Sequence, residues 1–147
     1  MAFSYGPLIC IGTYLVQRHA VSNQVLMLSS LLGILIGLFL LINEFPDFNA
    51  DRLAVKRTLV VRLGRRQASL LFAWILVATF GVVMILPLFD HSYITWLGLI
   101  AAFPAYSAAS RLRRFPETTS QIVPAQAATL LCFLLFALGT GIGLLLY

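Results

Sequence analysis

The sequence predicts an all-α membrane protein, a polytopic bundle of about five transmembrane helices. Of its 147 residues, 61% are hydrophobic and 10% are charged, and the mean hydropathy is +0.96. A soluble domain of this size could not keep so much apolar surface from water. The apolar residues also form runs close to roughly 20 residues, the length that a helix needs to cross a hydrocarbon core of about 30 Å.

Five apolar runs divide the chain, and we expect each to be a membrane span within a single domain, residues 1–147. They cover residues 2–17, 23–42, 67–87, 93–110 and 123–147. We expect helices because a helix satisfies its backbone hydrogen bonds within itself, as the bilayer interior requires. Glycine pairs four residues apart, at Gly33 and Gly37 and at Gly139 and Gly143, are typical of faces where such helices approach closely.

The basic residues predict the orientation of these spans, because loops rich in Lys and Arg stay in the cytoplasm. Residues 43–66 hold six basic residues and residues 111–122 hold three, whereas the turn at 87–92 holds none. We therefore expect an integral protein of the bacterial inner (plasma) membrane, with residues 43–66 in the cytoplasm. The net charge of +5 follows from this topology. It gives no reason to expect nucleic acid as a partner, and membrane lipids are the expected surroundings.

Residues 43–66, NEFPDFNADRLAVKRTLVVRLGRR, differ from the rest of the chain, and we call them the motif loop. They hold three of the five acidic residues and six of the ten basic residues. The segment predicts the end of one helix, a break at Pro46, and a second helical stretch through the basic residues. Both signs of charge therefore gather between two apolar spans.

The motif loop contains the spacing N-x-x-x-D-x-x-x-D, at Asn43, Asp47 and Asp51. On a helix, residues four apart share a face, and two such carboxylates repel each other unless a cation lies between them. Magnesium is usually held by one or two carboxylates together with phosphates, and Lys and Arg bind phosphate. This spacing is compatible with a magnesium–diphosphate site. It is equally compatible with a solvated cytoplasmic loop whose acids balance its arginines.

The longer pattern favours the first interpretation. NEFPDFNADRLAVKRTLVVRLG resembles the second aspartate-rich motif of the UbiA superfamily of intramembrane prenyltransferases, and YGPLICIGTYLVQ resembles the helix before it. The likeness is closest to the 1,4-dihydroxy-2-naphthoate polyprenyltransferases, in which NE-x-PD-x-x-AD is followed by KRTL-VRLG. One departure is Val55, where these enzymes commonly have Gly, and it bears on the flexibility of the loop.

The resemblance implies a nine-helix fold with two aspartate-rich motifs facing each other across a central cavity. The five runs correspond to the last five helices, and the first motif is not among these residues. We therefore expect the C-terminal half of an enzyme, inactive alone and paired with the missing N-terminal half or with another copy. Its expected reaction transfers a prenyl chain from a polyprenyl diphosphate to an aromatic acceptor, 1,4-dihydroxy-2-naphthoate of menaquinone biosynthesis, with Mg²⁺ as cofactor.

The resemblance also implies roles for individual residues of the motif loop. Asp47 and Asp51 are the expected metal ligands and catalytic residues. The expected substrate-binding residues are Lys56 and Arg57 for the diphosphate, Arg62 as a weaker candidate, and Asn43 and Glu44 for lining the pocket or orienting the acceptor.

Two alternatives stay open. One is a non-catalytic membrane protein that binds prenyl diphosphate or scaffolds an enzyme. The other is a small transporter, which is disfavoured because none of the predicted spans has an ionisable residue at its centre.

Overall fold

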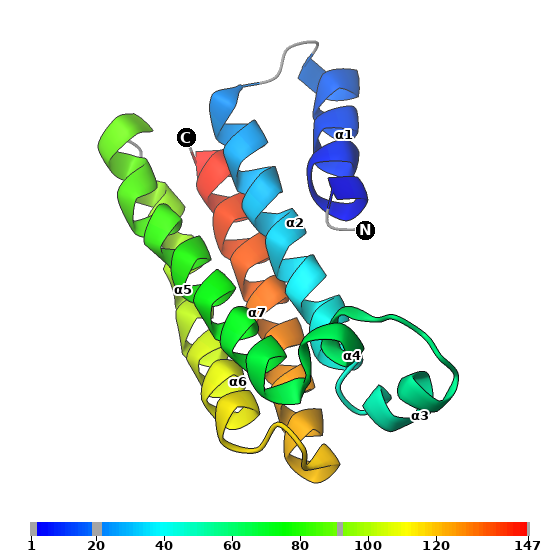
Figure 1. Ribbon diagram of the computed structural model, residues 1–147. Coiled ribbons are helices and arrows are strands. Elements are labelled where there is room, and N and C mark those ends of the chain that lie inside the picture. Colours follow the sequence, from blue (N-terminus) through cyan, green and yellow to red (C-terminus); the bar gives the residue numbers. More distant parts are fainter. Residues whose placement is uncertain (1–2, 19–21, 91–92, 147) are drawn as a thin grey trace.

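The computed structural model describes residues 3–18, 22–90 and 93–146, and this part of the chain is helical with no strand. The predicted all-α membrane bundle is confirmed (Figure 1). A π-helical turn η1 (Ser4–Leu8) leads into α1 (Ile9–Arg18), and a 3₁₀ segment η2 (Tyr93–Ala101) leads into α6 (Ala102–Arg114). The other helices are α2 (Asn23–Asn43), α3 (Phe48–Leu53), α4 (Leu59–Leu63), α5 (Arg65–Asp90) and α7 (Thr119–Leu146).

Three helices of the described part are long and apolar enough to cross a membrane. They are α2 over Asn23–Asn43, α5 over Arg65–Leu88 and α7 over Thr119–Gly143. The runs at 2–17 and 93–110 are helical too, but each is divided between two helix types. Pro7 lies inside η1, and Pro104 lies in the first turn of α6. Because proline has no backbone N–H to donate to the carbonyl four residues earlier, a regular α-helix is interrupted near both positions.

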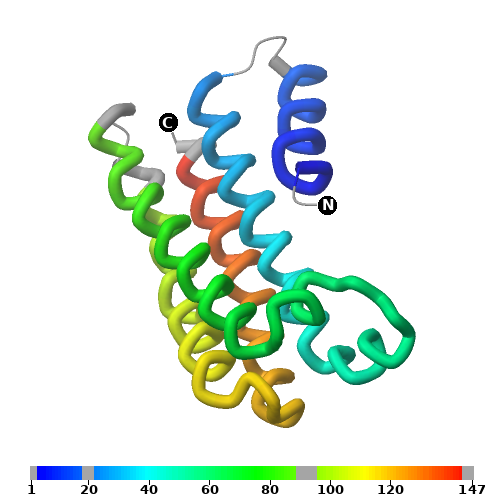
Figure 2. The backbone as a smooth tube through the Cα atoms, viewed as in Figure 1, coloured from blue at the N-terminus to red at the C-terminus, as the bar shows by residue number. Residues whose placement is uncertain are grey.

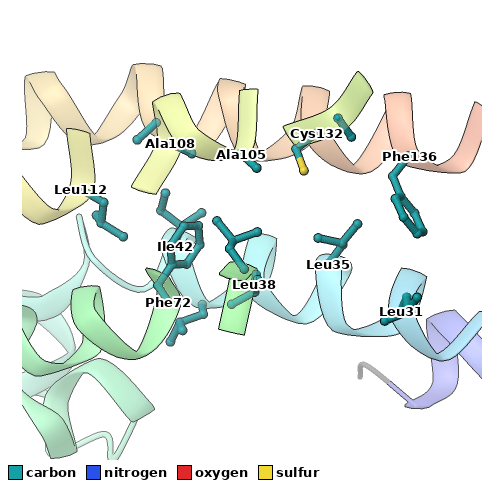
Figure 3. Close-up of a cluster of buried hydrophobic side chains, with 14 of the residues drawn as sticks. Leu31, Leu35, Leu38, Ile42, Phe72, Ala105, Ala108, Leu112, Cys132 and Phe136 are labelled. Carbon is teal, nitrogen blue, oxygen red and sulfur yellow. The ribbon is translucent and has the colours of Figure 1, made fainter. Parts of the chain in front are cut away.

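The core lies between α2, α5, α6 and α7, and Figure 3 shows side chains from these helices meeting there. Buried side chains recur at alternating spacings of three and four residues, which places them on one helix face. On α2 they are Leu28, Leu31, Leu35, Leu38 and Ile42, and on α7 they are Ile122, Ala125, Thr129, Cys132 and Phe136. Large apolar side chains also cover the outside, such as Trp74, which is 70% exposed. Such an exterior suits lipid as the solvent.

The polar side chains buried in the bundle form hydrogen bonds within their own helices. The hydroxyl of Thr129 donates to the carbonyl of Ala125 at 2.8 Å, and that of Thr140 donates to Phe136 at 2.7 Å. Thr79 does the same with the carbonyl of Ile75. These hydroxyls therefore avoid the cost of an unpaired polar group in an apolar interior.

Glycines allow two close backbone contacts. A Cβ added to Gly6 in η1 would clash with the Cα of Gly33 in α2, and one added to Gly139 would lie 2.6 Å from the carbonyl oxygen of Leu97. The predicted close approach is thus confirmed at Gly33 and Gly139. It holds η1 against α2 and η2 against α7, as small residues do in membrane bundles.

The charged segments gather at one end of the bundle. α2 ends there, the motif loop follows, α5 begins there and α6 ends there (Figures 1 and 2). Since nine of the ten basic residues belong to the motif loop or to the last turn of α6, we call this end the motif end. The bundle therefore has one strongly basic surface, at the motif end.

Candidate functional site

The motif loop folds into two short helices joined by a turn and a non-helical segment. The turn after α2 includes Pro46, so the predicted break at that residue is confirmed. The predicted helical stretch through the basic residues is wrong at Lys56 and Arg57, which lie in the non-helical segment between α3 and α4. The reason lies in the backbone: Val55 adopts a φ of +56°. Residues in that region cannot continue a right-handed helix.

Val55 is the one residue other than glycine with positive φ in the part of the chain that the structure describes. The left-handed region is costly for a β-branched residue and open to glycine. From the sequence, the Val at this position was expected to bear on the flexibility of the loop. The structure instead gives position 55 a defined conformation that ends α3 and turns the chain back toward Asp51.

Asp47 and Asp51 are one helical turn apart. The amide of Asp51 donates to the carbonyl of Asp47 at 2.8 Å. Asn43 belongs to the end of α2, on the far side of the break, so the expected face shared by all three residues is wrong for Asn43. The two acids also differ in exposure. Asp51 is buried, at 8% exposed, whereas Asp47 is exposed and has no side-chain hydrogen bond at the start of α3.

After α3 the chain folds back, and Lys56 contacts Asp51. Its Nζ lies 3.1 Å from Oδ1 of Asp51, and its backbone amide donates to the carbonyl of Asp51 at 2.9 Å. A cationic group thus lies against the buried carboxylate. Arg57 and Arg62 are exposed nearby in the chain, on the segment before α4 and within α4.

The structure places Asn43 and Glu44 in contacts that fix the loop. Oε2 of Glu44 accepts from the backbone amide of Val60 at 3.1 Å, which satisfies one of the unpaired amides at the start of α4. Oδ1 of Asn43 accepts from Nε2 of Gln126 on α7 at 2.9 Å. These two bonds join the end of α2 to α4 and to α7.

Sequence reasoning missed Gln126 and the particular role of Arg65. The guanidinium of Arg65 donates to the carbonyl of Phe45 at 3.2 Å and to that of Glu117 at 3.3 Å. It also lies 4.9 Å from the centroid of the Phe48 ring. Arg65 therefore ties the motif loop to the connection between α6 and α7. One available signal was that Gln126 is an amide inside an otherwise apolar run, where a partner is needed.

The donor set of the motif loop fits magnesium. Within the described residues, no group of three or more His, Cys, Asp or Glu side chains gathers around one point. Magnesium does not require such a group, because it is commonly held by one or two carboxylates with phosphate oxygens and water completing its coordination. Asp47 and Asp51 can provide the carboxylates. The exposed Arg57 and Arg62 can bind the phosphate oxygens.

The fold and the motif loop together define a membrane-embedded helical protein with a charged loop between two of its long helices. The model of the UbiA prenyltransferase family matches residues 1–123, and the chain belongs to this family. The chain is 34% identical over 99 residues to the 1,4-dihydroxy-2-naphthoate octaprenyltransferase of Escherichia coli (strain K12). That match covers 67% of this chain and 32% of the relative, so it spans about a third of the relative's length. No solved structure matches the chain.

Proposed function

We propose that this chain forms part of a magnesium-dependent prenyltransferase. In that enzyme it holds the diphosphate of a polyprenyl diphosphate while the prenyl chain passes to an aromatic acceptor. The acceptor we propose is 1,4-dihydroxy-2-naphthoate, as in menaquinone biosynthesis. Membership of the UbiA family supports the class of reaction, and the relative at 34% identity is named for that acceptor.

The observation that carries the proposal is the environment of Asp51. A solvated loop whose acids only balance its arginines would be expected to leave those acids exposed. Asp51 is instead 8% exposed and lies 3.1 Å from Lys56, with Asp47 one turn away. A carboxylate withdrawn from water beside a cation supports a site that is organised before its ligand arrives.

Each residue then has a distinct role. Asp47 and Asp51 would hold Mg²⁺, which when bound supplies positive charge against the departing diphosphate. Lys56, Arg57 and Arg62 would bind the phosphate oxygens, and Lys56 would turn from Asp51 toward them.

The two residues at the end of α2 would contact the acceptor. Asn43 and Glu44 border the same loop, and their bonds to Gln126 and to the amide of Val60 would hold them in place. The loop would face the cytoplasm, since it carries most of the basic residues. A first aspartate-rich motif would come from another part of the enzyme or from another copy.

The direct test is prenyl transfer by acid variants. In membranes where the chain is expressed with helices that supply a first aspartate-rich motif, Asp47→Ala and Asp51→Asn should each lower prenylation of 1,4-dihydroxy-2-naphthoate by about 100-fold. Glu117→Ala is the matched control, because Glu117 is an exposed acid near the motif end and only its backbone carbonyl contacts Arg65.

Binding of farnesyl diphosphate to the same membranes gives a second measurement. Magnesium should strengthen this binding in the wild type and in Glu117→Ala, and should not do so in the two Asp variants. Unchanged transfer by either Asp variant would contradict the proposal. Magnesium-dependent binding without transfer in any complemented membrane would favour the non-catalytic alternative.

A further inference from the structure

Helices α5 and α6 pack against each other (Figure 1). An apolar groove between them is lined by residues of both helices. Its volume is about 320 Å³. Small side chains such as the buried Ala105 line it, together with the exposed Val77 and Tyr106. Its polar lining residues are Ser110 and Arg113 at the motif end, besides the Tyr106 hydroxyl. The groove is therefore apolar along its length and basic at one end.

A second hollow adjoins the first on the α5 side. Its volume is about 240 Å³, and it is lined by Leu70, Ala73, Trp74, Val77 and Arg113. Ala73, Val77 and Arg113 line both hollows. Two apolar hollows thus meet at a single arginine.

The length of the groove matches one leaflet of a membrane. Its lining on α6 extends from Ala102 to Arg113, eleven residues along the helix, which corresponds to about 16 Å. The hydrocarbon core is about 30 Å thick, so a single leaflet contributes about half of it. A partner helix that crossed the bilayer would be expected to continue its contact beyond this depth.

Arg113 provides the charge at the basic end. It is exposed, and within the described chain it has no ion pair or hydrogen bond to another residue. Arg111 and Arg114 flank it in the last turn of α6. Basic residues beside an apolar groove at the membrane surface recognise the phosphate of anionic lipids.

We propose that the α5–α6 groove binds one anionic phospholipid of the leaflet next to the motif end. The phosphate lies on Arg113, and the two acyl chains occupy the two hollows. A polyprenyl diphosphate fits this surface less well, because it has a single chain and no carboxylate lines either hollow to hold its metal. The site is separate from Asp47 and Asp51 and does not depend on the proposed reaction.

Native mass spectrometry of the purified full chain in detergent tests whether the positive charge of Arg113 holds the lipid. Dioleoyl phosphatidylglycerol should remain bound in preference to dioleoyl phosphatidylcholine. Arg113→Ala should weaken phosphatidylglycerol binding about fivefold, the effect of one basic residue near an anionic membrane surface. Arg111→Ala removes the same charge from the same helix end without changing the lining of either hollow, and should leave binding close to wild type.

Larger side chains in the two hollows test whether the lipid's acyl chains occupy them. Ala73→Leu narrows both hollows and should reduce phosphatidylglycerol binding, whereas Ala78→Leu adds the same bulk to an exposed position of α5 outside them. One-chain lysophosphatidylglycerol should bind more weakly than the two-chain lipid. The proposal is overturned if Arg113→Ala and Arg111→Ala weaken binding equally, or if the two phospholipids bind equally. It is also overturned if farnesyl diphosphate displaces the lipid, or if Ala73→Leu abolishes self-association and leaves lipid binding unchanged.

Discussion

Val55 is the residue of the motif loop whose backbone conformation most restricts the choice of side chain. Its φ of +56° ends α3 and brings Lys56 back to Asp51. A β-branched side chain at positive φ stores backbone strain. Glycine would adopt the same conformation without the clash, and this explains in physical terms why glycine is suited to this position.

We therefore expect Val55→Gly to stabilise the protein. Relief of the strain outweighs the additional chain entropy of glycine, for a net gain of about 1 kcal/mol in the free energy of unfolding. The midpoint of thermal unfolding in detergent should rise. Val55→Ala keeps a Cβ and should gain much less, and Val61→Gly, within α4, should lose stability. A lower midpoint for Val55→Gly would show that the conformation at position 55 is not strained.

The pairing of Lys56 with Asp51 gives a prediction for the metal alone. Lys56 neutralises the buried carboxylate of Asp51. In Lys56→Met this negative charge can bind another cation instead. Because the carboxylate of Asp51 is buried, loss of its cationic partner should lower the unfolding midpoint without metal. Added Mg²⁺ should raise the unfolding midpoint of this variant more than that of the wild type.

The control for this measurement is Arg52→Met. Arg52 is an exposed basic residue of α3 that forms no ion pair with Asp51 in the structure. Its removal should not increase the magnesium effect. If both variants respond to Mg²⁺ as the wild type does, Asp51 does not hold the ion.

The elements of the motif end are joined by a few long-range contacts. Glu44 joins α2 to α4, Gln126 joins α7 to α2, and Arg65 joins α5 to the loop and to the α6–α7 connection. Small helices such as α3 and α4 are not stable alone. Their positions therefore depend on these contacts more than on local sequence.

Arg65→Lys should loosen the loop while leaving the charge unchanged. Lysine cannot donate to both the Phe45 and Glu117 carbonyls with the planar geometry of a guanidinium, and it loses the stacking of that plane on Phe48. Trypsin should then cleave at the exposed Arg52 and Arg57 several times faster. Arg66→Lys is the matched control, because Arg66 is the exposed neighbour and makes none of these contacts. Equal cleavage rates in wild type and Arg65→Lys would mean that Arg65 does not hold the loop.

These contacts also explain which parts of the structure could be predicted from the sequence. Hydropathy predicted α2, α5 and α7, and Pro46 predicted the break after α2, since both are local signals. The non-helical segment at Lys56 was not predicted, because it depends on the backbone of one residue, Val55. The bond between Asn43 and Gln126 joins residues 83 positions apart. Spacing within the motif loop contains no information about it.

At the scale of the whole molecule, the bundle is polarised by charge. Nine of ten basic residues belong to the motif loop or to the end of α6, at the motif end, while the described start of α2 lies at the other end (Figure 2). Moving so many cations across a bilayer during insertion is costly, so the polarity should fix the orientation. It should also place the proposed magnesium–diphosphate site and the proposed lipid groove beside the same leaflet.

Cysteine labelling of intact cells measures this orientation. With Cys10 and Cys132 replaced, Leu53→Cys provides a thiol at a residue that is 86% exposed in the motif loop. Asn23→Cys provides one at an exposed residue of the opposite end. A membrane-impermeant maleimide should label Asn23→Cys from outside and should reach Leu53→Cys only in inverted vesicles. The reverse pattern would place the aspartates outside the cell, away from the cytoplasmic side on which the proposed function places the site.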